Sequence, residues 1–94
     1  MATLSSRTIQ SALKHLPGWR IRRERLHKRF TFQSFREAIG FVAGVAELAE
    51  RARHHPDVTI RYNRVDLSLW THSAGGLTRK DLDLAKKIEQ LLAA

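Results

Sequence analysis

The chain has 94 residues, no cysteine and a formal net charge of +8 at pH 7. This length fits a single domain, residues 1–94, with a modest core, and the missing cysteines exclude disulfides and thiolate zinc sites. No apolar run approaches the roughly 20 residues that cross a bilayer, and residues 1–15 show no signal-peptide pattern. We therefore expect a cytoplasmic protein with no membrane partner.

The positive charge is concentrated in one short segment, whose basic residues are Arg20, Arg22, Arg23, Arg25, Lys28 and Arg29. Such a patch can attract nucleic acid or another anionic partner. On an exposed hairpin the same residues also discourage edge-to-edge aggregation. Because no helix-turn-helix or RNP pattern accompanies the charge, we expect no nucleic-acid partner.

The first third of the chain predicts a helix followed by two strands. Residues 5–16 show helical apolar spacing with a serine cap at the start, and Pro17-Gly18 stops the helix. Residues 19–26 and 26–32 have the alternation of strands. Lys28 falls on the apolar face of the second strand, and no Gly or Asn marks the turn between the two.

The longest predicted helix spans residues 34–53. Ser34 and Glu37 form a capping-box pattern at its start, and a broad apolar stripe follows. Pro56 ends the helical run. Since the residue before a proline is pushed toward extended geometry, His55 is expected to be extended at a helix-to-strand junction.

The last third predicts two more strands and a helix. Residues 58–62 and 65–70 alternate, and Asn63-Arg64 fits a two-residue turn in which Asn takes a positive φ. A loop over residues 71–77 leads to a helix over residues 78–92, which Thr78 and Asp81 would cap. The predicted fold class is α+β: a four-stranded antiparallel sheet with three helices packed on one face, in the order α-β-β-α-β-β-α.

Three of the five histidines lie between residues 54 and 72, namely His54, His55 and His72. Imidazole has an unperturbed pKa of about 6.5, so three converging imidazoles would suit a reaction that is mostly proton transfer. Adjacent extended residues point to opposite sides, so His54 and His55 are not expected to share a metal ion, and we expect no metal site. His15 and His27 are expected to be exposed.

Each of these residues also has a purely structural interpretation. One histidine of the His54-His55 pair could cap carbonyls at the helix end while the other is solvated. Asp81 could simply support backbone N–H groups at a helix start. Tyr62 and Trp70 are ordinary sheet residues, and Glu50 could be surface helix.

Taken together, the motifs resemble the pterin-4a-carbinolamine dehydratases. The motif residues are Glu50, His54-His55-Pro56, Tyr62, Thr71-His72 and Gly76-Leu77-Thr78-x-x-Asp81. The resemblance extends over about residues 16–91 through Leu16-Pro17-Gly18-Trp19, Phe30-x-Phe32-x-x-Phe35-x-x-Ala38 and Val45-Ala46-x-Leu48-Ala49-Glu50. Two positions depart from the family pattern: Arg53 stands where an acidic residue is frequent, and Lys80 where an arginine is frequent.

The resemblance implies removal of water from a 4a-hydroxytetrahydropterin to give quinonoid dihydropterin, with no metal, redox step or other cofactor. It implies that His54 and His72 supply acid and base, and that His55 orients the pterin and shares the proton work. It also implies that the substrate-binding residues are Glu50, Pro56, Tyr62, Thr71 and Asp81.

The resemblance further implies a pterin small-molecule substrate and a homodimer or homotetramer. The alternative is a non-catalytic assembly or regulatory protein on the same fold, for example a Rubisco assembly factor. In such a protein we would expect the histidines to be eroded, and all three are present here.

Overall fold

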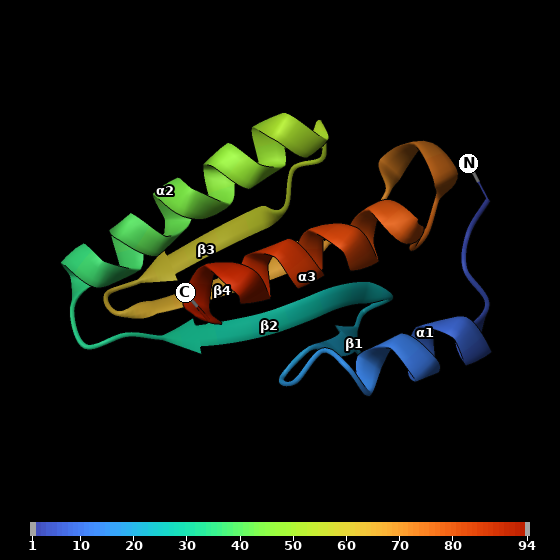
Figure 1. Cartoon of the computed structure of the whole chain (residues 1–94), viewed down its shortest axis with the longest axis horizontal. Helices are drawn as coiled ribbons and strands as arrows, with labels where there is room; N and C mark the ends of the chain where they lie inside the picture. Colours follow the sequence, from blue (N-terminus) through green and yellow to red (C-terminus); the bar gives the residue numbers. More distant parts are fainter. Residues whose placement is uncertain (1, 94) are drawn as a thin grey trace.

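The computed structural model describes residues 2–93, so both ends of the predicted single domain, Met1 and Ala94, lie outside it. The elements follow the predicted order, with one additional short helix, η1. They are α1 Ser6–Leu13, β1 Arg20–Arg22, β2 Arg25–Thr31, α2 Phe35–Ala52, β3 Asp57–Arg61, β4 Arg64–Leu69, η1 His72–Ala74 and α3 Arg79–Ala93. The helices lie on one side of the sheet (Figure 1), and within the described residues the other face carries no helix.

Serine side chains begin the first two helices, as predicted. The Ser5 hydroxyl accepts a hydrogen bond from the Thr8 N–H at 3.2 Å, and the Ser34 hydroxyl accepts one from the Glu37 N–H at 3.1 Å. Helix α1 ends three residues before the predicted boundary at Leu16. Leu16 precedes a proline, which disfavours helical backbone there, and its N–H closes a tighter bond to the carbonyl of Leu13.

The four strands form one antiparallel sheet in the order β1-β2-β4-β3. Two hairpins are joined through β2 and β4, which pair Leu26 with Leu69 and Phe30 with Val65. Side chains alternate between the two faces of a strand, so these four residues and Leu67 point toward the helices, where all five are buried.

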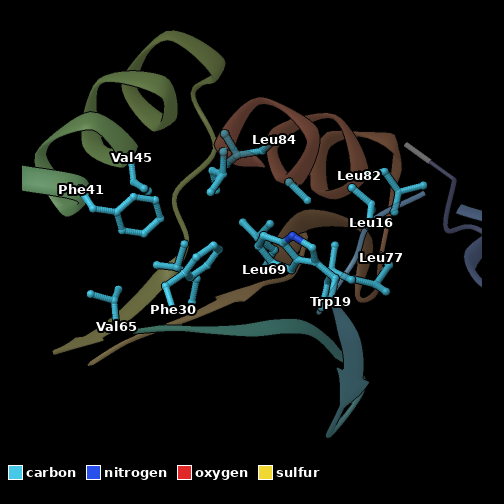
Figure 2. Close-up of a cluster of buried hydrophobic side chains, with 14 of the residues drawn as sticks. Leu16, Trp19, Phe30, Phe41, Val45, Val65, Leu69, Leu77, Leu82 and Leu84 are labelled. Atoms are coloured by element: carbon cyan, nitrogen blue, oxygen red, sulfur yellow. The ribbon is translucent and has the colours of Figure 1, made fainter. Parts of the chain in front are cut away.

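The core lies between this face and the helices. Figure 2 shows Phe41 and Val45 of α2 above Phe30 and Val65 of the sheet, with the rings of Phe30 and Phe41 4.7 Å apart between centroids. The other end of the core, also visible in Figure 2, is made by Leu16, Trp19, Leu77 and Leu82. Burial of these side chains supplies most of the stabilisation that a domain of this size can gain.

Lys28 points toward the helices without disturbing the register. Its Nζ lies 2.7 Å from Oε2 of Glu89 and donates to the Pro17 carbonyl at 2.8 Å. The indole N–H of Trp19 donates to the same Glu89 oxygen at 2.9 Å. The ammonium group is therefore paired where the lysine stem crosses the apolar face.

The first hairpin differs from the prediction, which extended its first strand to residue 26. Arg22 pairs with Arg25, so Arg23 and Glu24 form a two-residue turn. Both residues have a positive φ, +52° and +66°, a conformation that favours Gly, Asn or Asp. The turn lies where the chain carries none of the residues that normally signal it.

The second hairpin turns one residue earlier than predicted. Arg61 pairs with Arg64, so Tyr62 and Asn63 form the turn, and the positive φ of +55° falls on Tyr62. The Asn63 amide instead donates to the Phe32 carbonyl at 2.7 Å. Its own carbonyl accepts the Phe32 N–H at 2.8 Å. These contacts with the end of β2 hold Asn63 in place.

The expectation that His27 is exposed is wrong. His27 is 6% exposed, although it lies on the helix-free face of the sheet. It occupies β2, one of the two inner strands, with Arg20 opposite on β1 and Ser68 opposite on β4. Neighbours on both sides therefore cover the ring. His15 is exposed, as predicted.

Candidate functional site

Helix α2 ends in a left-handed turn that fixes the direction of the His54-His55 segment. Arg53 adopts φ +52°, the His54 N–H donates to the Ala49 carbonyl at 3.1 Å, and the Arg53 N–H donates to the Glu50 carbonyl at 3.3 Å. This pair of bonds is the Schellman pattern of helix C-termini. The chain then runs through Pro56 into β3.

The two adjacent histidines point to opposite sides, as expected for an extended segment. His54 is 8% exposed, whereas the side chain of His55 is 64% exposed. The Nε2 atom of His55 lies 2.5 Å from Oε2 of Glu50, which is in the last turn of α2. One imidazole is thus held inside the protein and the other is presented to solvent beside a carboxylate.

The carboxylate of Asp81 is fully buried and contacts three residues outside its own helix. Its Oδ1 lies 2.5 Å from Nε2 of His54, and its Oδ2 accepts the Thr71 hydroxyl at 2.7 Å and the Thr78 N–H at 2.9 Å. The bond from Thr78 is the helix-capping contact predicted from the sequence. The other two contacts join the end of α2 and the loop before α3 to the same group.

These contacts define the chemistry that His54 can perform. The carboxylate of Asp81 already accepts hydrogen bonds from Thr71 and Thr78, so it acts as an acceptor toward His54 too. We therefore assign the proton between the two side chains to Nε2 of His54. That arrangement leaves Nδ1 as the ring atom able to exchange a proton. A carboxylate that fixes the tautomer and orientation of a histidine in this way is a common feature of histidines that take part in acid–base chemistry.

His72 is exposed at the start of η1, in a loop that Thr71 anchors. The Thr71 hydroxyl lies 2.8 Å from that of Thr78, and its N–H donates to the Gly76 carbonyl at 3.1 Å. Gly75 has φ +70°, which lets this short loop close. The same threonine that contacts Asp81 therefore sets where His72 emerges.

Sequence reasoning missed the side chains that support His72. The imidazole packs against Trp70 with ring centroids 4.9 Å apart and planes at 70°. The guanidinium of Arg25, from β2, lies 4.6 Å above the centre of the Trp70 ring. The position of Trp70 directly before Thr71-His72 was the only signal in the sequence.

The structure brings most of the predicted site residues to one end of the sheet. We call this group the histidine cluster; it is made by Glu50, His54, His55, Thr71, His72 and Asp81. Pro56 is half-buried directly after it. Tyr62 lies elsewhere: it is 69% exposed in the turn after β3, whose five residues separate it from Pro56.

Within residues 2–93, no group of three or more His, Cys, Asp or Glu side chains is arranged to hold a metal ion. No helix in this part of the chain is long and apolar enough to cross a membrane.

Comparisons with known proteins agree over nearly the whole chain. The model of the family described as pterin 4 alpha carbinolamine dehydratase matches residues 2–91. A Thermomicrobium roseum protein named for this dehydratase is 55% identical over 91 residues, which cover 97% of this chain and 98% of its own. A protein of the same name from Acidobacterium capsulatum is 50% identical over 92 residues, which cover 98% of this chain and 100% of its own.

Solved structures agree with the fold. The crystal structure of a transcriptional coactivator/pterin dehydratase from Brucella melitensis superposes with a TM-score of 0.91 at 37% identity, covering 95% of this chain and 97% of its own. A pterin dehydratase-like protein identified as a RuBisCO assembly factor in the alpha-carboxysome gives a TM-score of 0.71 at 24% identity. It covers 85% of this chain and 95% of its own, and it shows the fold alone.

Proposed function

This chain belongs to the pterin 4 alpha carbinolamine dehydratase family, and from that premise we propose that it removes water from a 4a-hydroxytetrahydropterin to give quinonoid dihydropterin. The observation that carries the proposal is the buried contact of His54 with Asp81, which also holds the loop of His72 through Thr71. Imidazoles and carboxylates are joined there in an arrangement suited to proton transfer.

The reaction needs one acid and one base. The acid protonates the departing hydroxyl at C4a, the C4a–O bond breaks, and water leaves. The base takes the proton from N5, and the electrons of the N–H bond form the N5–C4a double bond. Each catalytic group ends with the opposite protonation state, and exchange with solvent restores it. Positioned acid–base groups typically accelerate such a step by about 10²–10⁴-fold.

We assign the acid and base to His54 and His72 as a pair, since interacting imidazoles titrate as a set. His54 would exchange its proton through Nδ1 while Asp81 holds Nε2. His72 would act from the loop, supported by Trp70. His55, which is exposed and paired with Glu50, would bind and orient the pterin, and Glu50 would contribute to the polar edge of the site.

The test is the dehydration rate of enzymatically generated 4a-hydroxytetrahydropterin, followed by ultraviolet absorbance with and without the protein. We expect acceleration by the wild type, its loss in His72→Asn, and its loss in a His54→Asn/His72→Asn double variant. His15→Asn is the matched control, because His15 is an exposed histidine outside the histidine cluster.

Circular dichroism of every variant separates a catalytic defect from an unfolded chain. The single His72 variant keeps the test decisive if the buried His54 position does not tolerate change. A folded wild-type protein that gives no acceleration would refute the dehydratase proposal. It would favour the alternative of a non-catalytic assembly protein on this fold.

A further inference from the structure

The helix-free face of the sheet carries a hollow of about 610 Å³ that lies outside the histidine cluster. We call it the basic hollow; it is lined by Gly18, Arg20, Arg22, His27 and Arg29. Strand pairing explains the grouping. Arg20 on β1 lies directly opposite His27 on β2. Residues two apart on one strand share a face, so Arg22 on β1 and Arg29 on β2 lie on this face as well.

Two of these arginines lack a partner of opposite charge. Asp66 receives two bonds from Arg29, at 2.9 and 3.2 Å. Within residues 2–93, no carboxylate lies within ion-pairing distance of Arg20 or Arg22. Arg22 also lies directly opposite Arg25, and like charges in that relation are destabilising. The hollow thus holds uncompensated positive charge that a bound anion would neutralise.

The floor of the hollow contains a second unsatisfied group. His27 is buried, and its Nδ1 atom has no hydrogen-bond partner among the described residues. Its Nε2 lies 3.6 Å from Oδ1 of Asp66. Unpaired buried polar atoms are rare in native proteins and call for an explanation. A protonated His27 would place a third positive charge beside Arg20 and Arg22.

We propose that the basic hollow binds a small dianionic oxyanion, the phosphate group of a phosphomonoester or inorganic phosphate, between Arg20 and Arg22 and above His27. Guanidinium groups donate two parallel N–H bonds to such an oxyanion. The hollow is open and larger than a single phosphate, which leaves room for an organic substituent. The proposal does not depend on the dehydratase activity, because none of these residues belongs to the histidine cluster.

The charged groups around His27 give the site a pH signature. Arg20 and Arg22 face it from β1, Arg29 from β2 and Asp66 from β4. Burial lowers the pKa of His27, and the three arginines lower it further, while Asp66 opposes them. A dianion between the arginines would favour the protonated ring, so binding should take up a proton and be tighter at pH 5.5 than at pH 8.

Sodium sulfate is the first probe, because its charge is constant over this pH range and any pH dependence belongs to the protein. The ring protons of His27 are followed by NMR at constant ionic strength set with sodium chloride. We expect a saturable shift of His27 with sulfate, tighter at low pH, and no such shift of His15. Inorganic phosphate and phenyl phosphate, titrated in the same way, distinguish the free anion from an ester.

The decisive comparison is between two variants of equal net charge. Arg20→Gln/Arg22→Gln removes the unpaired arginines, and Arg36→Gln/Arg51→Gln removes two exposed arginines of α2. We expect the first to lower sulfate affinity by about ten-fold for each arginine and the second to leave it nearly unchanged. Equal losses of sulfate affinity in both variants would indicate general charge attraction and would overturn the proposal. The absence of a saturable His27 shift in the folded wild type would overturn it as well.

Discussion

The Nε2 atom of His54 lies 2.5 Å from Oδ1 of Asp81, although the two residues are 27 positions apart in the chain. This contact joins the C-terminal end of α2 to the first turn of α3. Because Thr71 donates to the other oxygen of the same carboxylate, the loop that carries His72 is held by the same residue. The arrangement of the proposed catalytic groups therefore depends on one buried aspartate.

Replacing this aspartate should impair both activity and stability. In Asp81→Asn the side chain can no longer accept from His54, Thr71 and Thr78 in the same way, so the tautomer and position of His54 change. We expect a loss of roughly 10²-fold or more in dehydration rate and of about 1–3 kcal/mol in the free energy of unfolding. Stopped-flow absorbance and urea unfolding measure the two effects. Asp83→Asn, an exposed position on α3, should change neither, and an Asp81→Asn enzyme with wild-type rate would contradict this role.

Trp70 should affect catalysis more than stability. Its ring contacts both the Arg25 guanidinium and the His72 imidazole, so Trp70→Ala would free His72 from its position. We expect kcat to fall roughly 10- to 100-fold, as for other small displacements of catalytic groups, with KM less affected. Trp70→Phe keeps an aromatic ring beside His72 and should recover most of the rate. Equal rates for the alanine and phenylalanine variants would show that the contact does not position His72.

Arg53 pays a conformational cost at the end of α2, because it adopts φ +52° without being a glycine. Arg53→Gly should therefore raise the free energy of unfolding by roughly 0.5–1 kcal/mol. Arg51→Gly, two residues earlier and inside the helix, should lower it by up to about 1 kcal/mol. Urea unfolding of both variants tests whether the two changes in the free energy of unfolding have opposite signs. Destabilisation by Arg53→Gly would show that the arginine side chain stabilises the fold by more than its backbone strain costs.

His27 should make the fold sensitive to mild acid. Burial lowers its pKa below the ordinary value of 6.5, so between the two pKa values the unfolded chain binds more protons than the folded one. Stability from this residue is present above pH 6.5 and is lost as the pH falls below it, by at most about 1.4 kcal/mol per pH unit for one proton. Unfolding free energies of His27→Gln should decline less steeply from pH 7 to 5 than those of the wild type. His15→Gln should follow the wild type, and parallel slopes for all three proteins would refute the effect.

The outer surface of α2 should mediate the expected homodimer or homotetramer. Phe35 and Ile39 are 51% and 41% exposed, and the exposed Ala43 and Ala46 continue the same helical stripe. Burial of such a stripe against a second copy is favourable. Analytical ultracentrifugation should show an oligomer that Phe35→Glu/Ile39→Glu dissociates, whereas Arg51→Glu, at an exposed position on a different side of the helix, should have little effect. A monomeric wild type would contradict the expectation.

Local patterns were sufficient to predict most of the fold. Serine caps, an alternating apolar pattern and the Pro56 stop depend on neighbouring residues alone, and each lies where the sequence placed it. The hairpin turns were misplaced for the same reason. Arg23, Glu24 and Tyr62 take positive φ values because strand pairing on both sides requires it, against the preferences of the residues themselves.

In the candidate site, too, some features follow from local sequence and others from tertiary contacts. The sequence by itself determined the candidate residues of the histidine cluster, the opposite directions of His54 and His55, and the helix-capping role of Asp81, since each follows from spacing and backbone geometry. Only the tertiary structure decided that Asp81 also holds His54 and Thr71, that Trp70 and Arg25 support His72, and that His27 is buried beneath arginines. The physical reason is that these contacts join strands and helices distant in the chain, and burial and charge at each residue depend on neighbours that only folding brings together.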